Sequence, residues 1–79
     1  MGSSQVALIT GASSGFGHAL ALELLRRNFV VYAAARRLEP MQELQQAGAY
    51  LLSMDVCDEA SVNAGIEQIM ASQGRIDVV

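Results

Sequence analysis

The sequence predicts an α/β fold, the N-terminal half of a doubly wound parallel sheet with the element order β-α-β-α-β-α-β. Short apolar runs alternate with longer segments in which apolar residues recur every three or four positions, a pattern typical of βαβ units. A glycine-rich turn lies where the first apolar run gives way to the first helical segment. Right-handed crossovers between parallel strands then favour the strand order 3-2-1-4.

Four apolar runs are the predicted strands. Residues 6–9 form a continuous apolar stretch, which is typical of a parallel strand covered on both faces. The second and third strands are predicted over residues 29–35 and 50–54. The fourth begins at Ile76, and the sequence ends within it at Val79. We therefore interpret the chain as half of a sheet that is truncated in strand four.

The first predicted helix covers residues 15–27. Its apolar residues recur at helical spacing, so that one face is able to pack on the sheet. This predicted face consists of Phe16, Leu20 and Leu24, reinforced by Ala21 and Leu25.

Two further helices complete the pattern. The second is predicted over residues 39–47, with Pro40 suited to its first turn and Gly48 to its C-terminal cap. The third is preceded by a capping residue at 57 or 58 and ends at Gly74. Its predicted sheet-facing stripe is Val62, Ile66, Ile69 and Met70.

The composition excludes several classes of protein. With 79 residues, 52% of them hydrophobic, and a net charge of -3, the chain is at most one domain and is not a disordered segment. Five arginines and no lysine against eight acidic residues give no basic face for nucleic acid. No apolar stretch is long enough for a membrane span. The single cysteine, Cys57, forms no internal disulfide, so we expect a reducing, cytoplasmic location.

The turn after the first predicted strand reads T-G-A-S-S-G-F-G. Gly11 suits a tight turn, Gly15 allows a pyrophosphate to approach the main chain, and Gly17 allows the helix to pack closely on the strand. The helix N-terminus favours an anion, and Ser13 and Ser14 add hydroxyl donors. A phosphate-binding P-loop is excluded because the chain has no lysine. A turn that binds no ligand remains the alternative.

This turn resembles the T-G-x-x-x-G-x-G cofactor motif of the short-chain dehydrogenase/reductase family. The likeness extends to residues 35–37, 54–56 and 74–77, so residues 1–79 are interpreted as a partial NAD(P)-binding Rossmann domain. Residues 35–41 are similar to the branch that contains 1-acyldihydroxyacetone phosphate reductases and 17β-hydroxysteroid dehydrogenase-like enzymes. The resemblance implies that cofactor is bound by Gly11, Ser13, Ser14, Gly15, Phe16 and Gly17.

The end of the second predicted strand favours NADP(H) over NAD(H). An NAD-binding domain presents Asp or Glu here to hold the ribose 2′-OH, whereas this chain has three alanines followed by Arg36 and Arg37. Guanidinium groups bind a 2′-phosphate by donating charge-assisted hydrogen bonds to its oxygens. We favour Arg36, which is nearer the strand end, with Ser13 assisting at the same phosphate. Two solvated arginines are the alternative.

After the third predicted strand, the family resemblance implies that Asp55 accepts a hydrogen bond from the adenine amine and that Val56 borders the ring. Alternatively, Asp55 caps the helix that follows. We interpret His18 as a solvated residue of the first helical turn; the alternative is that it contacts a phosphate. We assign no site to Cys57, which lacks a cationic partner nearby in the sequence. The methionines Met41, Met54 and Met70 are interpreted as core residues.

No catalytic residue and no metal site are predicted. The family's Tyr-x-x-x-Lys pair is absent, because the chain has no lysine and neither Tyr32 nor Tyr50 stands in that pattern. The resemblance implies the cofactor-binding part of an NADP(H)-dependent oxidoreductase that interconverts a small-molecule carbonyl and alcohol by hydride transfer. Such a protein is expected to be a homo-oligomer when complete. The alternatives are a non-catalytic nucleotide-binding or interaction module, if the chain truly ends at Val79, and a cofactor-dependent regulator.

Overall fold

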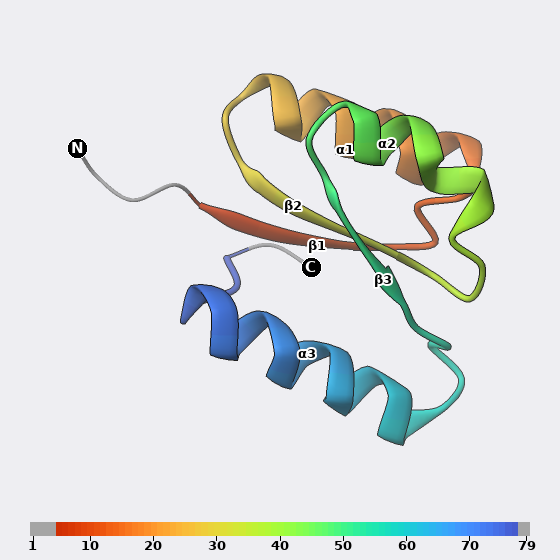
Figure 1. The fold of residues 1–79 in the computed structure, drawn as a ribbon, viewed down its shortest axis with the longest axis vertical. Helices are drawn as coiled ribbons and strands as arrows, with labels where there is room; N and C mark the ends of the chain where they lie inside the picture. Colours follow the sequence, from red (N-terminus) through yellow and green to blue (C-terminus); the bar gives the residue numbers. More distant parts are fainter. Residues whose placement is uncertain (1–4, 78–79) are drawn as a thin grey trace.

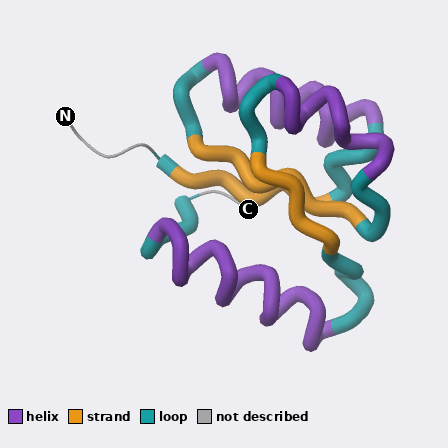
Figure 2. The backbone as a smooth tube through the Cα atoms, viewed as in Figure 1, coloured by secondary structure: helices purple, strands orange, loops and turns teal. Residues whose placement is uncertain are grey.

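The computed structural model describes residues 5–77 and contains a three-stranded parallel sheet with helices on both faces (Figure 1). Helices α1 and α2 cover one face, and α3 covers the other (Figure 2). This arrangement confirms the predicted α/β class. The elements in chain order are β1 (Val6–Thr10), α1 (Gly15–Arg26), β2 (Val30–Ala35), the 3-10 turn η1 (Glu39–Met41), α2 (Gln42–Gln46), β3 (Tyr50–Ser53) and α3 (Glu59–Gln73).

Strand β2 lies between β1 and β3, which confirms the predicted order 3-2-1. The predicted fourth strand is not formed in the described part of the chain. Ile76 and Asp77 have no strand assignment, and Val78 and Val79 lie outside the described residues. The Asp77 N–H nevertheless donates to the Val6 carbonyl at 2.8 Å, which places Asp77 beside the start of β1, at the edge where strand four was predicted.

Two apolar clusters hold the helices on the sheet because successive residues of each strand point to opposite faces. The cluster under α1 and α2 consists of Ala7, Ile9, Ala12, Ala21, Val31, Ala33, Met41, Leu44 and Ala49. The cluster under α3 consists of Val6, Leu8, Tyr32, Ala34, Leu52, Met54 and Ile69.

The face of α1 that packs on the sheet was predicted in part: Ala21 is buried and Leu24 and Leu25 pack against the same cluster, as predicted, whereas two other residues do not. Phe16, predicted to lie on this face, is 83% exposed, and Leu20 is also exposed. The buried residues of α1 are Gly17, which was not part of the predicted face, and Ala21, which was. Gly17 packs directly against the backbone of the preceding turn. Helix α1 is therefore rotated about its axis relative to the predicted orientation, and its stripe of small residues faces the sheet.

Helix α3 begins and ends close to the predicted residues. Asp58 is its N-cap, and the Asp58 carboxylate accepts the Ala60 N–H at 3.1 Å. Gly74 ends the helix with φ +76°, a left-handed conformation that favours glycine. Ile69 is buried as predicted, but Met70 is 45% exposed and is not a core residue.

No helix in residues 5–77 has the length and apolar character needed to cross a membrane.

Candidate functional site

The candidate site lies at the carboxyl edge of the sheet, where the ends of parallel strands meet. The first part of it is the turn after β1. Gly11 has φ +65°, a left-handed conformation that favours glycine. Ala12 follows it, is fully buried, and donates its N–H to the Ala34 carbonyl of β2 at 3.2 Å. The turn is therefore fixed to the neighbouring strand.

Gly15 and Gly17 lie two residues apart but have different surroundings. A Cβ atom at Gly17 would lie 2.6 Å from the Gly11 carbonyl oxygen and 3.1 Å from Ala12 Cα. Gly17 is thus required for α1 to approach the turn, as the sequence predicted. A Cβ atom at Gly15 would meet no atom of the described protein within 4 Å. The packing of the described residues therefore does not require glycine at position 15, and the space beside its main chain is open.

The two serines of the turn differ in what their hydroxyl groups do. Ser14 is the N-cap of α1; its Oγ accepts the Gly17 N–H at 3.4 Å and donates to the Gly11 carbonyl at 2.7 Å. The single proton of this hydroxyl is therefore used inside the turn, so Ser14 holds the turn instead of offering a donor to a ligand. Ser13 is exposed and lines the pocket described next.

A pocket of about 350 Å³ collects residues from the ends of all three strands. Its lining consists of Gly11, Ser13, Ala35, Arg36, Met54, Asp55, Val56 and Cys57. Five of these were singled out in the sequence as cofactor-binding, although they are separated by up to 45 positions in the chain. The remaining predicted residues lie outside the lining: Ser14, Gly15, Phe16, Gly17 and Arg37.

The arginines that follow β2 are both exposed, but they are not equivalent. Arg36 lines the pocket, and Arg37 does not. The backbone carbonyl of Arg36 accepts a hydrogen bond from Ser53 Oγ at 3.4 Å, which joins the ends of β2 and β3. Within residues 5–77, neither guanidinium pairs with a carboxylate. Arg36 therefore supplies positive charge at the pocket that no internal partner neutralises.

The loop from β3 to α3 supplies the opposite wall. The Asp55 N–H donates to Ser61 Oγ at 3.0 Å, and Asp55 Oδ1 accepts the Cys57 N–H at 3.0 Å. Asp55 does not cap α3, because Asp58 does so. Val56 is 61% exposed and offers an apolar surface to the pocket. The tie through Ser61 was not predicted from the sequence.

His18 has a partner that the sequence did not suggest. Its Nε2 lies 3.0 Å from Glu43 Oε1 and so joins the start of α1 to α2. A contact between residues 25 positions apart leaves no local signal in the sequence. The side chain of His18 belongs to the contact between the two helices and does not line the pocket.

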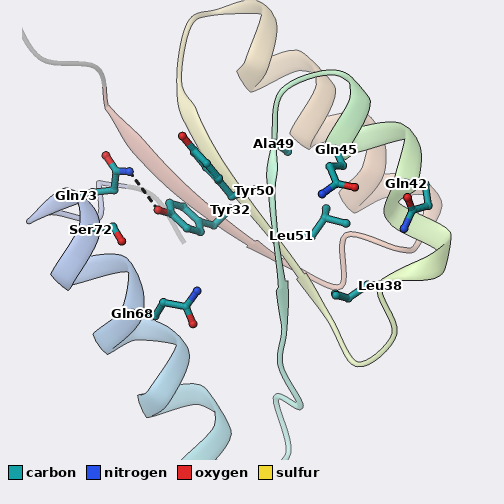
Figure 3. Close-up of a pocket in the computed structure, with 10 residues that line it drawn as sticks. All are labelled: Tyr32, Leu38, Gln42, Gln45, Ala49, Tyr50, Leu51, Gln68, Ser72 and Gln73. Carbon is teal, nitrogen blue, oxygen red and sulfur yellow. Dashed lines mark hydrogen bonds between the residues drawn. The ribbon is translucent and has the colours of Figure 1, made fainter.

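A second and larger hollow, about 530 Å³, flanks β3 (Figure 3). The rings of Tyr32 and Tyr50 stack there with centroids 5.1 Å apart, and Gln73 Nε2 donates to the Tyr32 hydroxyl at 3.1 Å. The lining consists of Tyr32, Leu38, Gln42, Gln45, Ala49, Tyr50, Leu51, Gln68, Ser72 and Gln73. None of these is charged, and none was predicted to bind a ligand. This hollow shares no lining residue with the candidate site.

The chemistry of the candidate site fits an anionic nucleotide. The N-terminus of α1 provides partial positive charge and the Arg36 guanidinium a full one. Gly15 leaves room beside the main chain, and Asp55 provides a carboxylate acceptor. No Tyr or Lys lies in the pocket lining to transfer a proton. Residues 5–77 contain no group of three His, Cys, Asp or Glu side chains suited to a metal ion. The arrangement is suited to binding and positioning.

Comparison with known proteins gives a consistent result. The chain matches the short chain dehydrogenase family over residues 5–79. Over 95% of its length it is 40% identical to a 3-ketodihydrosphingosine reductase of Bacteroides thetaiotaomicron and 36% identical to an NADPH-dependent 1-acyldihydroxyacetone phosphate reductase of Saccharomyces cerevisiae. It covers 26% and 27% of these two relatives, so it spans about a quarter of their length.

Solved structures show the same likeness. A short-chain dehydrogenase from Streptomyces avermitilis superposes on 96% of this chain with a TM-score of 0.89 and 36% sequence identity. A metagenomic short-chain oxidoreductase in complex with NADP superposes with a TM-score of 0.84 and 33% identity, again over 96% of this chain. The chain covers 30% and 37% of these two structures.

Proposed function

The chain belongs to the short-chain dehydrogenase family, and we propose that it is the cofactor-binding part of an NADP(H)-dependent oxidoreductase. The observation that carries this proposal is the single pocket lined by Gly11, Ser13, Arg36, Asp55 and Val56. These residues come from three different loops. The sequence selected them for different parts of one cofactor, and they line one pocket.

The proposed assignment follows the order of the loops. The pyrophosphate lies at the N-terminus of α1, beside Gly15. The 2′-phosphate is held by Arg36, with Ser13 assisting. The adenine lies beside Val56, with Asp55 as acceptor for its amine. Support for NADP(H) comes from Arg36, which is exposed and has no carboxylate partner within residues 5–77, and from the alanines that stand where an NAD-binding domain carries an acid.

We propose that the substrate is a small-molecule carbonyl or alcohol, and that a cytoplasmic homo-oligomer carries out the reaction. The bound nicotinamide cofactor supplies or accepts the hydride in this chemistry. The described residues contribute binding and orientation. Tyr32 and Tyr50 stack on each other on the α3 face, away from the pocket, so neither is placed to transfer a proton there. The intact mass of the native protein separates this proposal from the non-catalytic module: the oxidoreductase requires a chain several times longer than 79 residues.

The cofactor assignment is tested by titrating the full-length protein with NADPH and NADH in a calorimeter. Because one charge-assisted hydrogen bond contributes about 1.5 to 3 kcal/mol, we expect NADPH to bind about ten- to a hundredfold more tightly. Arg36→Ala should remove most of this preference. Arg37→Ala is the matched control: it removes the same charge one residue outside the pocket and should leave the preference within about threefold of wild type. Equal affinities for the two cofactors in the wild-type protein would contradict the proposal.

A further inference from the structure

Three hydrogen bonds in the loop between β3 and α3 converge on Asp55. The Asp55 N–H donates to Ser61 Oγ, the Asp55 carbonyl accepts the Asp58 N–H, and Asp55 Oδ1 accepts the Cys57 N–H, each at 3.0 Å. Both backbone groups and one carboxylate oxygen of Asp55 are therefore used within the protein. Oδ2 accepts no hydrogen bond from residues 5–77, and Asp55 lines the pocket.

Of these three hydrogen bonds, only the one to Ser61 links the loop to a rigid element. Cys57 and Asp58 follow Asp55 directly, so their hydrogen bonds form local turns that would move together with the loop. Ser61 lies in the first turn of α3, which is fixed on the sheet by its buried residues Gly65 and Ile69. The Ser61 hydroxyl thus sets where Asp55 stands relative to the sheet.

We propose that Ser61 is a positioning residue that selects the purine base of the cofactor through Asp55. The inference rests on the proposed function, since it requires the base to lie in this pocket. Asp55 Oδ2 is an acceptor that receives no hydrogen bond from the described residues. A carboxylate held in one place attracts the 6-amino group of adenine and repels the 6-carbonyl oxygen of a 6-oxopurine. Without the tie to Ser61, the loop shifts and this selection is lost, although the pocket itself remains.

The test measures the affinity of the full-length protein for NADPH and for the analogue in which hypoxanthine replaces adenine. The two ligands differ at position 6 of the base, so their affinity ratio reports the contact with Asp55. We expect the wild-type protein to bind NADPH at least about tenfold more tightly than the analogue. Ser61→Ala should bring the ratio to within about threefold, mainly by weakening NADPH.

Two variants serve as controls. Ser61→Thr keeps a hydroxyl at the same position and should retain the wild-type ratio. Ser72→Ala makes the same substitution near the other end of α3, outside the Asp55 loop, and should also retain it. In an Asp55→Ala background, where the ratio is already lost, Ser61→Ala should change it no further.

The outcomes separate this inference from the proposed function. A folded wild-type protein that does not bind NADPH overturns the proposed function and this inference together. A wild-type protein that binds NADPH and the analogue equally keeps the NADP(H) assignment but overturns base selection by Asp55. If Ser61→Ala weakens both ligands by the same factor, the ratio is preserved, Ser61 only stabilises the fold, and the inference is wrong.

Discussion

Helices α1 and α3 both approach the sheet through a glycine, but the two glycines face different kinds of atoms. A Cβ atom at Gly17 of α1 would meet the Gly11 carbonyl oxygen and Ala12 Cα, which are backbone atoms. A Cβ atom at Gly65 of α3 would meet the end of the Met54 side chain and a methyl group of Leu52. Backbone in a tight turn cannot yield, whereas a methionine side chain rotates at little cost.

The difference extends to the two halves of the candidate site. On the α1 side, glycines and a helix N-terminus shape the site, and the Ser14 hydroxyl serves the turn itself. On the α3 side, the loop is shaped by side-chain oxygens of Ser61 and Asp55 that accept hydrogen bonds from backbone N–H groups. We infer that substitutions on the α1 side act through steric exclusion and cause large losses of stability. Substitutions on the α3 side should cause smaller losses that depend on the side chain introduced.

The largest effect is expected for Gly17→Ala. The added methyl group cannot fit 2.6 Å from the Gly11 carbonyl oxygen, so we expect the full-length protein to lose about 2 to 3 kcal/mol of unfolding free energy in urea denaturation. Gly15→Ala is the matched control, because the same methyl group meets no protein atom there. It should leave the unfolding free energy within about 0.5 kcal/mol of wild type and weaken NADPH at least about tenfold by filling the proposed phosphate space. Equal stabilities for the two variants would remove the contrast between the two glycines.

A smaller loss, about 1 kcal/mol, is expected for Gly65→Ala. Overpacking against Met54 is partly offset by the better helix propensity of alanine. The decisive measurement repeats the substitution in a Met54→Ala background, where the obstructing side chain is gone. There Gly65→Ala should become neutral or stabilising, while Gly17→Ala should cost the same in either background. A persistent loss at position 65 would show that the α3 face is as rigid as the α1 face.

The helix caps should show effects of about 1 kcal/mol each. Asp58→Ala removes the hydrogen bond to the Ala60 N–H at the start of α3, and Ser14→Ala removes the one to the Gly17 N–H at the start of α1. Thermal unfolding compares the two losses. Only Ser14→Ala also frees the Gly11 carbonyl, so it alone should weaken NADPH. Asp58→Asn, which keeps an acceptor oxygen, should restore most of the stability of α3.

The smallest effect concerns pH. The hydrogen-bonded Arg75 guanidinium, and next the Val6 N–H, hold the pKa of Asp77 below its ordinary value of 3.8. A group whose pKa is lower in the folded state contributes stability above its unfolded pKa and loses it as the pH falls through the folded one. The stability difference between wild type and Asp77→Asn should therefore be present at pH 6 and shrink below about pH 4. A difference that is independent of pH would exclude the ionised carboxylate as its cause.

Much of the fold was predictable because its signals are local. The strands are marked by apolar runs, and the turn after β1 by glycines that backbone geometry demands at positions 11 and 17. On α1, Phe16 and Leu20 were predicted wrongly, while Ala21 of the same predicted face is buried. The error arose because Phe16 and Gly17 lie on adjacent stripes of one helix. Hydrophobic periodicity favoured the stripe with large side chains, whereas close packing selected the one with small residues.

The candidate site was predictable to the extent that it follows strand ends. Residues that follow three parallel strands meet at one edge. The glycine turn indicated Ser13, the end of the second strand indicated Arg36, and the family resemblance implied Asp55. The contacts that hold them were not predictable, because Ser61 to Asp55 and His18 to Glu43 are hydrogen bonds set by how helices are placed. That the pocket binds NADP(H) stays a prediction.

The stacked pair of Tyr32 and Tyr50 provides an optical probe. They are the two tyrosines of a sequence without tryptophan, and they face each other across the β2–β3 pairing, in register. Their near-ultraviolet circular dichroism should therefore change when β3 separates from β2. Within these 79 residues, the tyrosine signals report on the α3 side of the sheet, whereas the turn of residues 10–17 contains no tyrosine and contributes nothing to them.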